Sequence, residues 1–149
     1  MKSFRYAFVV NSGIEDVWKF YTDINHLKII TPKEMGLKII EHDDEILKEG
    51  AEAEMSAKLV TKSKWRSKIT YIKPYEYVDE MMTGRFRKWK HKHTFEKITD
   101  NKTEVVDQIE FELPYGVLGR IFENYVMGRL SEIFKYRQKA TVLALESKV

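Results

Sequence analysis

The sequence predicts an α+β fold in which a seven-stranded antiparallel sheet wraps around one long C-terminal helix. Strand patterns run through residues 4–11 and through six further segments between residues 36 and 113. From Val117 to about residue 147 the apolar repeat changes to the period of a helix. No linker, repeat or low-complexity stretch interrupts the 149 residues, so we expect a single domain over residues 1–149.

Two short helices are expected after the first strand. Ser12 and Glu15 have the spacing of a capping box, in which each side chain accepts a hydrogen bond from the other residue's backbone N–H. The helix that follows has one apolar face, formed by Ile14, Val17, Trp18 and Tyr21. A second helix over residues 23–31 should stop near Pro32, because the residue before a proline disfavours the helical region.

Residues 51–60 give the clearest strand pattern. One face carries Ala51, Ala53, Met55, Ala57 and Leu59, and mostly charged residues alternate with them. Because several of these side chains are small, they leave room beneath the strand. The pattern therefore leaves space on the inner side of this strand.

The long C-terminal helix is expected to pack against the sheet along a broad apolar stripe. The stripe consists of Leu118, Ile121, Phe122, Tyr125, Val126, Leu130, Ile133, Phe134 and Leu143. A helix of about 30 residues would be roughly 45 Å long. Gly119 and Gly128 lie within it and are the points at which it is expected to bend.

A hairpin between residues 89 and 113 brings polar side chains to the inner face of the sheet. With a turn at residues 100–102, the inner pairs are Trp89 with Leu113, His91 with Phe111, His93 with Ile109, and Phe95 with Asp107. The outer pairs join opposite charges, Lys90 with Glu112 and Lys92 with Glu110. Ile98 then falls on the charged face, which indicates a bulge near the turn.

His91, His93 and Asp107 allow three interpretations. Two histidines one residue apart on a strand can both bind a metal, with Asp107 as third ligand, but no further histidine or cysteine has a suitable spacing. A histidine beside an aspartate also suits a general base, yet no nucleophile motif accompanies it. The residues alone favour buried polar groups that satisfy one another or line a pocket. We therefore expect neither a metal nor a cofactor.

The composition excludes several classes of protein. Without cysteine, the chain has no disulfide, thiolate nucleophile or Cys-ligated metal. A net charge of +3 is too small to imply a nucleic-acid partner. The N-terminus does not have the pattern of a signal peptide, and no apolar run approaches the roughly 20 residues of a membrane span. We expect a cytoplasmic protein without stable membrane insertion.

Five stretches occur in an order and spacing that resemble a known superfamily. They are "IEDVWKFYTDINHLKIITP", "WRSKITYIKP", "YVDEMMTGRFRKWKHKHTFE", "TEVVDQIEFELPYGVLG" and "IFKYR". The chain resembles the START-like (SRPBCC, Bet v 1-like, helix-grip) superfamily, and most closely its ligand-binding branch described as polyketide cyclase/dehydrase or "cell division inhibitor"-related. Arg85 departs from the pattern, since relatives tend to have proline there. The resemblance implies a helix-grip fold with an internal cavity for apolar molecules such as lipids, sterols or polyketides.

The leading hypothesis is that this cavity binds a small, mostly apolar or aromatic molecule. The residues expected to bind it are Met55, Trp65, Tyr71, Trp89, His91, His93, Phe95, Asp107, Ile109, Phe111, Phe122 and Tyr125. The resemblance brings no catalytic signature, but a cyclase, dehydratase or hydrolase with a His/Asp acid–base pair is the alternative. A further alternative is binding of nucleic acid or anionic membrane by the basic, aromatic segments 61–68 and 84–92. We expect a monomer or homodimer with no nucleic-acid partner.

Overall fold

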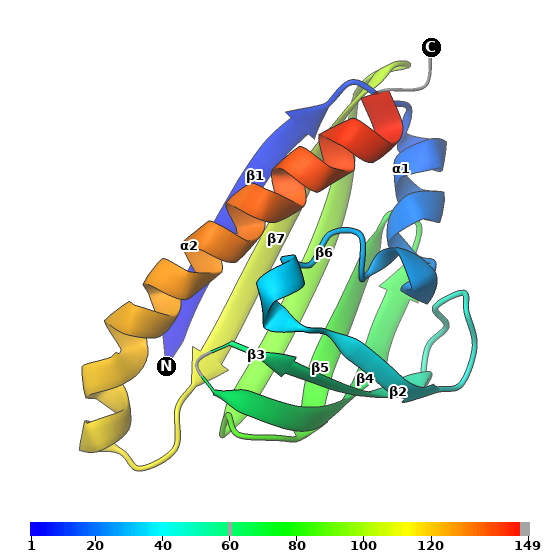
Figure 1. Ribbon diagram of the computed structural model, residues 1–149. Coiled ribbons are helices and arrows are strands. Elements are labelled where there is room, and N and C mark those ends of the chain that lie inside the picture. The colour runs from blue at the N-terminus through cyan, green and yellow to red at the C-terminus, as the bar shows by residue number, and fades with distance from the viewer. Residues whose placement is uncertain (60, 147–149) are drawn as a thin grey trace.

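The computed structural model describes residues 1–59 and 61–146, which form one curved antiparallel sheet and a long helix (Figure 1). The strands are β1 (Lys2–Val10), β2 (Lys38–His42), β3 (Glu52–Lys58), β4 (Lys62–Lys73), β5 (Glu76–Thr83), β6 (Lys88–Thr99) and β7 (Lys102–Glu112). The helices are α1 (Ile14–Tyr21), the short 3-10 helices η1 (Ile24–His26) and η2 (Lys33–Met35), and α2 (Val117–Glu146). The strand order is β1-β7-β6-β5-β4-β3-β2. The predicted α+β helix-grip fold is confirmed.

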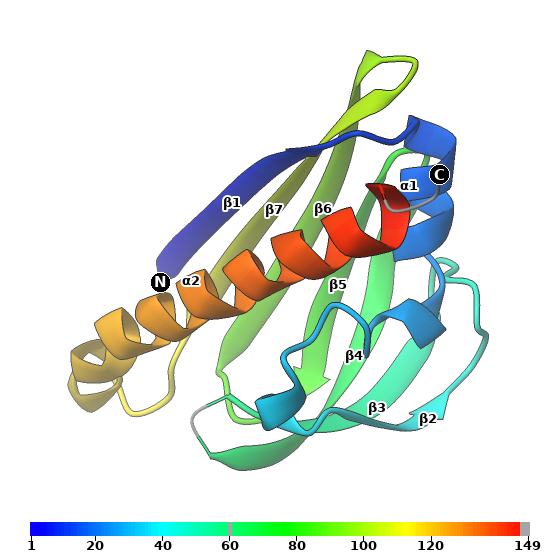
Figure 2. The same ribbon diagram turned by 45° about the horizontal axis from the view of Figure 1, so that its top comes forward.

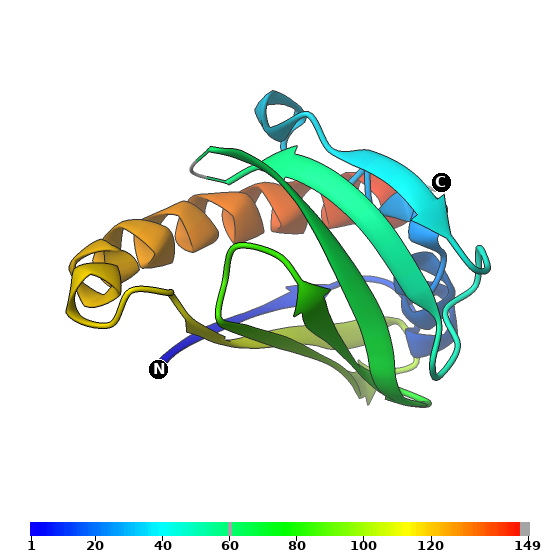
Figure 3. The ribbon, with the colours of Figure 1, turned by 90° about the horizontal axis from the view of Figure 1, so that it is seen from below.

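The sheet is strongly bent, and α2 lies across its concave side (Figures 2 and 3). The segment with α1, η1 and η2 connects the two edge strands, β1 and β2. It lies on the same side of the sheet as α2 (Figure 1). Because side chains alternate between the faces of each strand, every second residue of the sheet points into the space enclosed by these helices.

The core has two main parts along α2. Near the C-terminal end of α2, Val17 of α1, Phe95 of β6 and Leu145 are buried together. Toward the other end, Phe111 of β7 is buried with Val126 of α2. The residues between these parts are polar, and they form the site described below.

The predicted capping box is wrong. Gly13 is the N-cap of α1, and no side chain of the described residues caps the helix. The Glu15 carboxylate of the box accepts a hydrogen bond from the Tyr75 hydroxyl instead. A tertiary contact with the β4–β5 turn therefore replaces the local interaction. The Ser12 carbonyl accepts a hydrogen bond from the Thr103 hydroxyl, which ties the start of α1 to β7.

The predicted second helix is shorter than expected. Its regular part is η1, which Asp23 caps by accepting a hydrogen bond of 2.9 Å from the backbone N–H of Asn25. Pro32 does mark a boundary, but a second short helix, η2, follows it and was not predicted. Gly36 ends η2 with a φ of 57°, a left-handed conformation that glycine adopts at little cost.

The β6–β7 hairpin has a register two residues away from the predicted one. The inner pairs are Trp89 with Phe111, His91 with Ile109, and His93 with Asp107. The outer pairs are Lys88 with Glu112 and Lys90 with Glu110. The turn is shorter than predicted, and the register shifts at a bulge after Lys97. Because a shift of two residues keeps each side chain on its face, the inner residues are those expected, but His93 now lies beside Asp107.

The first turns of α2 depart from the predicted apolar stripe. They project past the sheet (Figure 3), and Leu118, Ile121, Phe122 and Tyr125 are exposed there. Leu143, near the other end, is exposed too. Val126, Leu130, Ile133 and Phe134 are buried as predicted. The apolar pattern of the sequence thus extends further along the helix than its contact with the sheet.

The two glycines of α2 are expected to respond in opposite ways to alanine. A Cβ at Gly119 would lie 2.4 Å from the Pro114 carbonyl oxygen, whereas one at Gly128 would meet no atom of the described residues within 4 Å. Gly128→Ala should raise the free energy of unfolding by about 0.5–1 kcal/mol, because alanine favours the helix. Gly119→Ala should lower it by about 1–3 kcal/mol, because the backbone before α2 must move. Urea unfolding measures both, and effects of the same sign would contradict this expectation.

Candidate functional site

A cavity of about 250 Å³ lies between the concave face of the sheet and α2. Its wall is mostly apolar and includes Ile30, Ala53, Met55, Ala57, Trp65, Trp89, Leu130 and Phe134. Ala53 and Ala57 project from β3 with side chains of only one carbon. Larger residues there would occupy the space, so these alanines help to keep the cavity open.

Half of the predicted site residues line this cavity, namely Met55, Trp65, Trp89, His91, His93 and Ile109. Phe95, Asp107 and Phe111 are buried in the sheet beside these residues but are not part of the cavity wall. Tyr71, Phe122 and Tyr125 lie outside the cavity.

Tyr71 is displaced from the inner face by a β-bulge. The pairing of β4 with β5 shifts between Ile69 and Tyr71, so that Ile72 rather than Tyr71 packs against the core. The Lys73 ammonium lies 5.8 Å from the centre of the Tyr71 ring. A strict alternation along β4 therefore predicts the wrong face beyond Ile69.

Phe122 and Tyr125 are 59% and 54% exposed on the part of α2 that projects past the sheet. Their expected place in the cavity wall is wrong, because the helix meets the sheet only from about Val126 onward. From α2, the cavity wall takes Leu130, Ile133, Phe134 and Arg137 instead.

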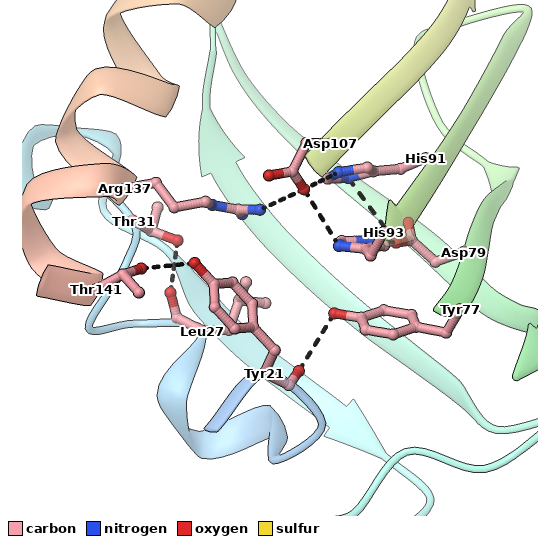
Figure 4. Close-up of polar contacts among 10 residues, drawn as sticks. All are labelled: Tyr21, Leu27, Thr31, Tyr77, Asp79, His91, His93, Asp107, Arg137 and Thr141. Atoms are coloured by element: carbon pink, nitrogen blue, oxygen red, sulfur yellow. Dashed lines mark hydrogen bonds and ion pairs between the residues drawn. The ribbon is translucent and has the colours of Figure 1, made fainter. Parts of the chain in front are cut away.

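Five titratable side chains meet at the cavity wall and form a buried charged cluster: Asp79, His91, His93, Asp107 and Arg137 (Figure 4). His91 Nε2 lies 2.7 Å from Asp107 Oδ1, and His93 Nε2 lies 2.6 Å from Asp79 Oδ2. The imidazole rings stack on one another with 3.6 Å between their centres. Asp107 is only 1% exposed, so its carboxylate interacts with these groups and not with bulk water.

Arg137 reaches the cluster from α2 (Figure 4). Its Nη1 lies 3.6 Å from Asp107 Oδ1, and its guanidinium carbon lies 4.7 Å from the centre of the Phe134 ring. Since Asp107 belongs to β7, this contact joins the helix to the sheet by a buried ion pair.

Asp79 and Arg137 were missed from the sequence. Asp79 alternates with Tyr77 and Met81, which line the cavity from β5. Arg137 lies between Phe134 and Thr141 on the buried side of α2. A charged residue at a position whose neighbours on the same face are apolar is the signal that could have found both.

The cluster changes the protonation of its members. Burial raises the pKa of Asp107, but the hydrogen bond with His91, the nearby His93 ring and the charge of Arg137 outweigh it and hold that pKa well below its usual range. Burial also raises the pKa of Asp79, and contacts with both histidines outweigh it, so this pKa is lowered too.

The two histidines shift in opposite directions. Burial lowers the pKa of His93, but its contacts with Asp107 and Asp79 are stronger and leave the pKa raised. Burial and the neighbouring charge of His93 lower the pKa of His91. The Arg137 guanidinium thus lies against the Asp107 carboxylate, and the two carboxylates together favour the charged form of His93.

Three polar atoms of the cluster are buried without a hydrogen-bond partner among the described residues: His93 Nδ1, Asp107 Oδ2 and Arg137 Nε. Buried polar atoms are normally paired with protein or water. His93 and Arg137 also line the cavity. Their unpaired nitrogens mark the place where a polar group in the cavity would gain most from the protein.

Tyrosines continue the polar wall beside the cluster (Figure 4). The Tyr77 ring stacks on His93 with 4.0 Å between ring centres, and its hydroxyl donates a hydrogen bond of 3.2 Å to the Tyr21 carbonyl. The Tyr21 hydroxyl lies 2.6 Å from Thr141 Oγ1. Burial raises the pKa of both phenols, so they are neutral hydrogen-bonding groups near neutral pH.

These features define a helix-grip domain with an internal, mostly apolar cavity and a charged cluster in its wall. The chain belongs to the polyketide cyclase / dehydrase and lipid transport family, whose model matches residues 10–135. It is therefore a START-like (SRPBCC) protein, as the sequence motifs predict. None of the helices in the described part of the chain has the length and hydropathy of a membrane span.

Solved structures share this fold at low sequence identity. A START superfamily protein from Mycobacterium smegmatis has a TM-score of 0.76 and 12% identity, with 99% of each chain covered. The protein TTHA0849 from Thermus thermophilus has a TM-score of 0.75 and 18% identity, with 96% of this chain and 98% of that chain covered. The Zhui aromatase/cyclase from Streptomyces sp. R1128 has a TM-score of 0.68 and 13% identity, covering 96% and 90%. No curated protein matches the chain in sequence.

Proposed function

We propose that the protein binds a small, mostly apolar or aromatic molecule in the cavity between the sheet and α2. The observation that carries this proposal is the combination of apolar walls with unpaired, buried nitrogens of His93 and Arg137 at one place in the wall. Ligand pockets typically pair a large apolar surface with a few polar groups that fix the orientation of the ligand.

The apolar walls supply the affinity. Trp65, Trp89 and Met55 face the cavity together with the alanines of β3. Removing apolar surface from water contributes about 25 cal/mol per Å², so a ligand that buries a ring or an acyl chain here gains several kcal/mol before the costs of association. The cavity therefore favours a compact apolar body over a highly charged one.

The charged cluster selects the polar end of the ligand. Arg137 Nε and His93 Nδ1 are hydrogen-bond donors when both groups carry their positive charge. They suit an acceptor oxygen, such as a ketone, a phenolate or a carboxylate. A ligand with one such oxygen on an apolar body would satisfy these atoms and fill the cavity at the same time.

A specific observation also supports catalysis as a second candidate function. His93 makes a short contact of 2.6 Å with Asp79 at the cavity wall, and a histidine oriented by a carboxylate can transfer protons. A solved structure of the same fold is named an aromatase/cyclase, which makes a cyclisation or dehydration the reaction to consider. In such an enzyme His93→Gln would abolish turnover and leave substrate affinity nearly intact.

The outer face of the sheet carries ion pairs that disfavour binding of a nucleic acid. Basic residues from the two aromatic segments pair with carboxylates there: Lys64 with Glu54 at 3.3 Å, Arg66 with Glu52 at 2.7 Å and Lys92 with Glu76 at 3.2 Å. These pairs reduce the positive potential on which non-specific binding of nucleic acid depends. The absence of a nucleic-acid partner stays a prediction, as do cytoplasmic location and a monomeric or homodimeric state.

The proposed function is tested by native mass spectrometry of protein purified from its own source, followed by denaturing extraction. We expect an apolar compound bound in a stoichiometric amount. A library of lipids and aromatic acids, ketones and phenols should contain members that raise the thermal midpoint, because a ligand of the folded state stabilises it. Protein that is always empty, with a midpoint that no member shifts, would overturn the proposal.

A further inference from the structure

Three metal-ligand atoms converge at one point in the cavity wall. Asp79 of β5 and His91 and His93 of β6 each offer a ligand atom, and these atoms all lie within 4.8 Å of one another. Asp79 Oδ2 lies 2.6 Å from His93 Nε2 and 3.9 Å from His91 Nδ1. The sequence suggested Asp107 as the third ligand of such a site and no metal was expected; in the structure Asp79, and not Asp107, supplies the carboxylate.

Asp107 lies beside the opposite nitrogens of both rings and makes a hydrogen bond with that of His91. Its Oδ1 lies 2.7 Å from His91 Nε2 and 3.4 Å from His93 Nδ1 (Figure 4). Each imidazole thus directs one nitrogen toward Asp107 and the other toward Asp79. In metal sites, a carboxylate commonly accepts a hydrogen bond from the histidine nitrogen that does not bind the metal. This fixes the tautomer and leaves the other nitrogen free as a ligand. Asp107 can do this for His91, whose Nδ1 then faces Asp79.

A cation beside Asp79 suits this arrangement. In the tautomers with protons on the nitrogens that face Asp107, the lone pairs of His91 Nδ1 and His93 Nε2 are directed toward the Asp79 carboxylate. A metal ion between these three groups would accept all of their lone pairs at once. Arg137 does not occupy this place, because its guanidinium contacts Asp107.

We infer that Asp79, His91 and His93 form a binding site for a divalent transition-metal ion of the zinc type, and that Asp107 positions the two histidines. Two imidazoles and one carboxylate are a ligand set that such ions accept readily. The side chains of all three residues also line the cavity. A bound ion would therefore have a coordination position open to the cavity for water or for a polar atom of a ligand. The site depends on the protein alone and stands independently of the proposed ligand.

The test is calorimetric titration of the EDTA-treated, dialysed full-length protein with zinc chloride and no organic ligand. We expect one ion per chain, together with release of protons as zinc displaces them from the site. Cobalt(II) added in place of zinc should give visible absorption that reports nitrogen and oxygen coordination. Zinc binding weaker than a Kd of about 100 µM in the wild type would overturn the inference.

Variants locate the ion. His91→Gln and Asp79→Asn remove ligands and should weaken zinc binding by roughly 100-fold or more, while Asp107→Asn should weaken it by about 10–100-fold through loss of orientation. His42→Gln is the matched control, because His42 lies on β2 outside the cluster, and it should leave the affinity unchanged. Circular dichroism confirms that each variant is folded. Equal affinity in wild type, His91→Gln and Asp79→Asn, or a loss in His42→Gln, would place the zinc elsewhere and overturn the inference.

The outcome for zinc is separate from the outcome for the cavity ligand. Zinc binding with no apolar ligand would leave the metal site standing and remove the proposed function. An apolar ligand bound by a protein that takes up no zinc would do the reverse.

Discussion

Replacing Asp107 with asparagine is expected to lower the free energy of unfolding by about 3–5 kcal/mol, because it leaves a buried charge without its partner. Asp107 is 1% exposed and lies 3.6 Å from the Arg137 guanidinium. Asparagine has the same shape and keeps one oxygen that can accept from His91. The loss therefore measures the missing negative charge.

Urea unfolding followed by circular dichroism measures this loss. For a chain of this size each kcal/mol corresponds to a shift of roughly 2–4 °C in the thermal midpoint, so the expected shift is about 6–20 °C. Asp100→Asn is the matched control, because Asp100 lies in the exposed β6–β7 turn, where it pairs with Lys97. It should behave like an ordinary surface substitution. A loss below about 1 kcal/mol for Asp107→Asn would contradict the assignment of a buried ion pair.

The double variant Asp107→Asn/Arg137→Met separates charge from packing. Removing both charges should cost clearly less than the sum of the single losses, because no uncompensated ion remains in the core. Additive losses would show instead that Arg137 and Asp107 contribute independently. The ion pair would then be incidental to the contact between α2 and the sheet.

The fold was predictable because it depends on patterns that tertiary contacts reinforce. Alternation along the strands and the change of period at Val117 each indicate which side of an element is buried, and the structure buries those sides along most of the sheet and along α2 from Val126 to Phe134. The capping box failed because it is a weak local preference. The contact of Glu15 with Tyr75 outweighs it.

The composition of the site was predictable only in part, because its register and pairing come from turns and bulges. The faces of His91, His93 and Asp107 follow from alternation alone. Their mutual distances follow from the length of the β6–β7 turn, which the predicted register overestimated. At Tyr71 a bulge reverses which residues of β4 face the core, and no residue type in "KITYIK" predicts this bulge.

Asp79 and Arg137 escaped prediction for a different reason. Asp79 meets the histidines because β5 pairs with β6, so that Asp79 lies opposite His91. Arg137 meets Asp107 because α2 crosses β7 at that point. The first contact depends on the register of β5 with β6, and the second joins segments that are far apart in sequence, so the three-dimensional arrangement decides both. Within each segment, the isolated charge on an apolar face was the available clue.

Replacing Ala57 with phenylalanine is expected to abolish binding of an apolar probe to the cavity and to leave the fold intact. Ala57 is 2% exposed on the inner face of β3 and lines the cavity. A benzyl group at this position would point into a space of about 250 Å³ and would occupy the volume that a ligand needs. We expect affinity for N-phenyl-1-naphthylamine, a neutral fluorescent probe, to fall by at least about 100-fold, or roughly 2.7 kcal/mol.

Ala57→Phe is expected to change the free energy of unfolding only slightly, because the added ring fills an open space and does not displace packed atoms. Overpacking of a dense core would cost about 1–3 kcal/mol. Ala7→Phe is the matched control, since Ala7 lies on the outer face of β1, opposite Val106. It should bind the probe like the wild type. Fluorescence titration measures the affinities, and thermal unfolding shows that each variant is folded. Equal probe affinity in folded Ala57→Phe and in the wild type would mean that the probe binds outside the cavity. The exposed apolar residues at the start of α2, Phe122 among them, would then be the place to look for it.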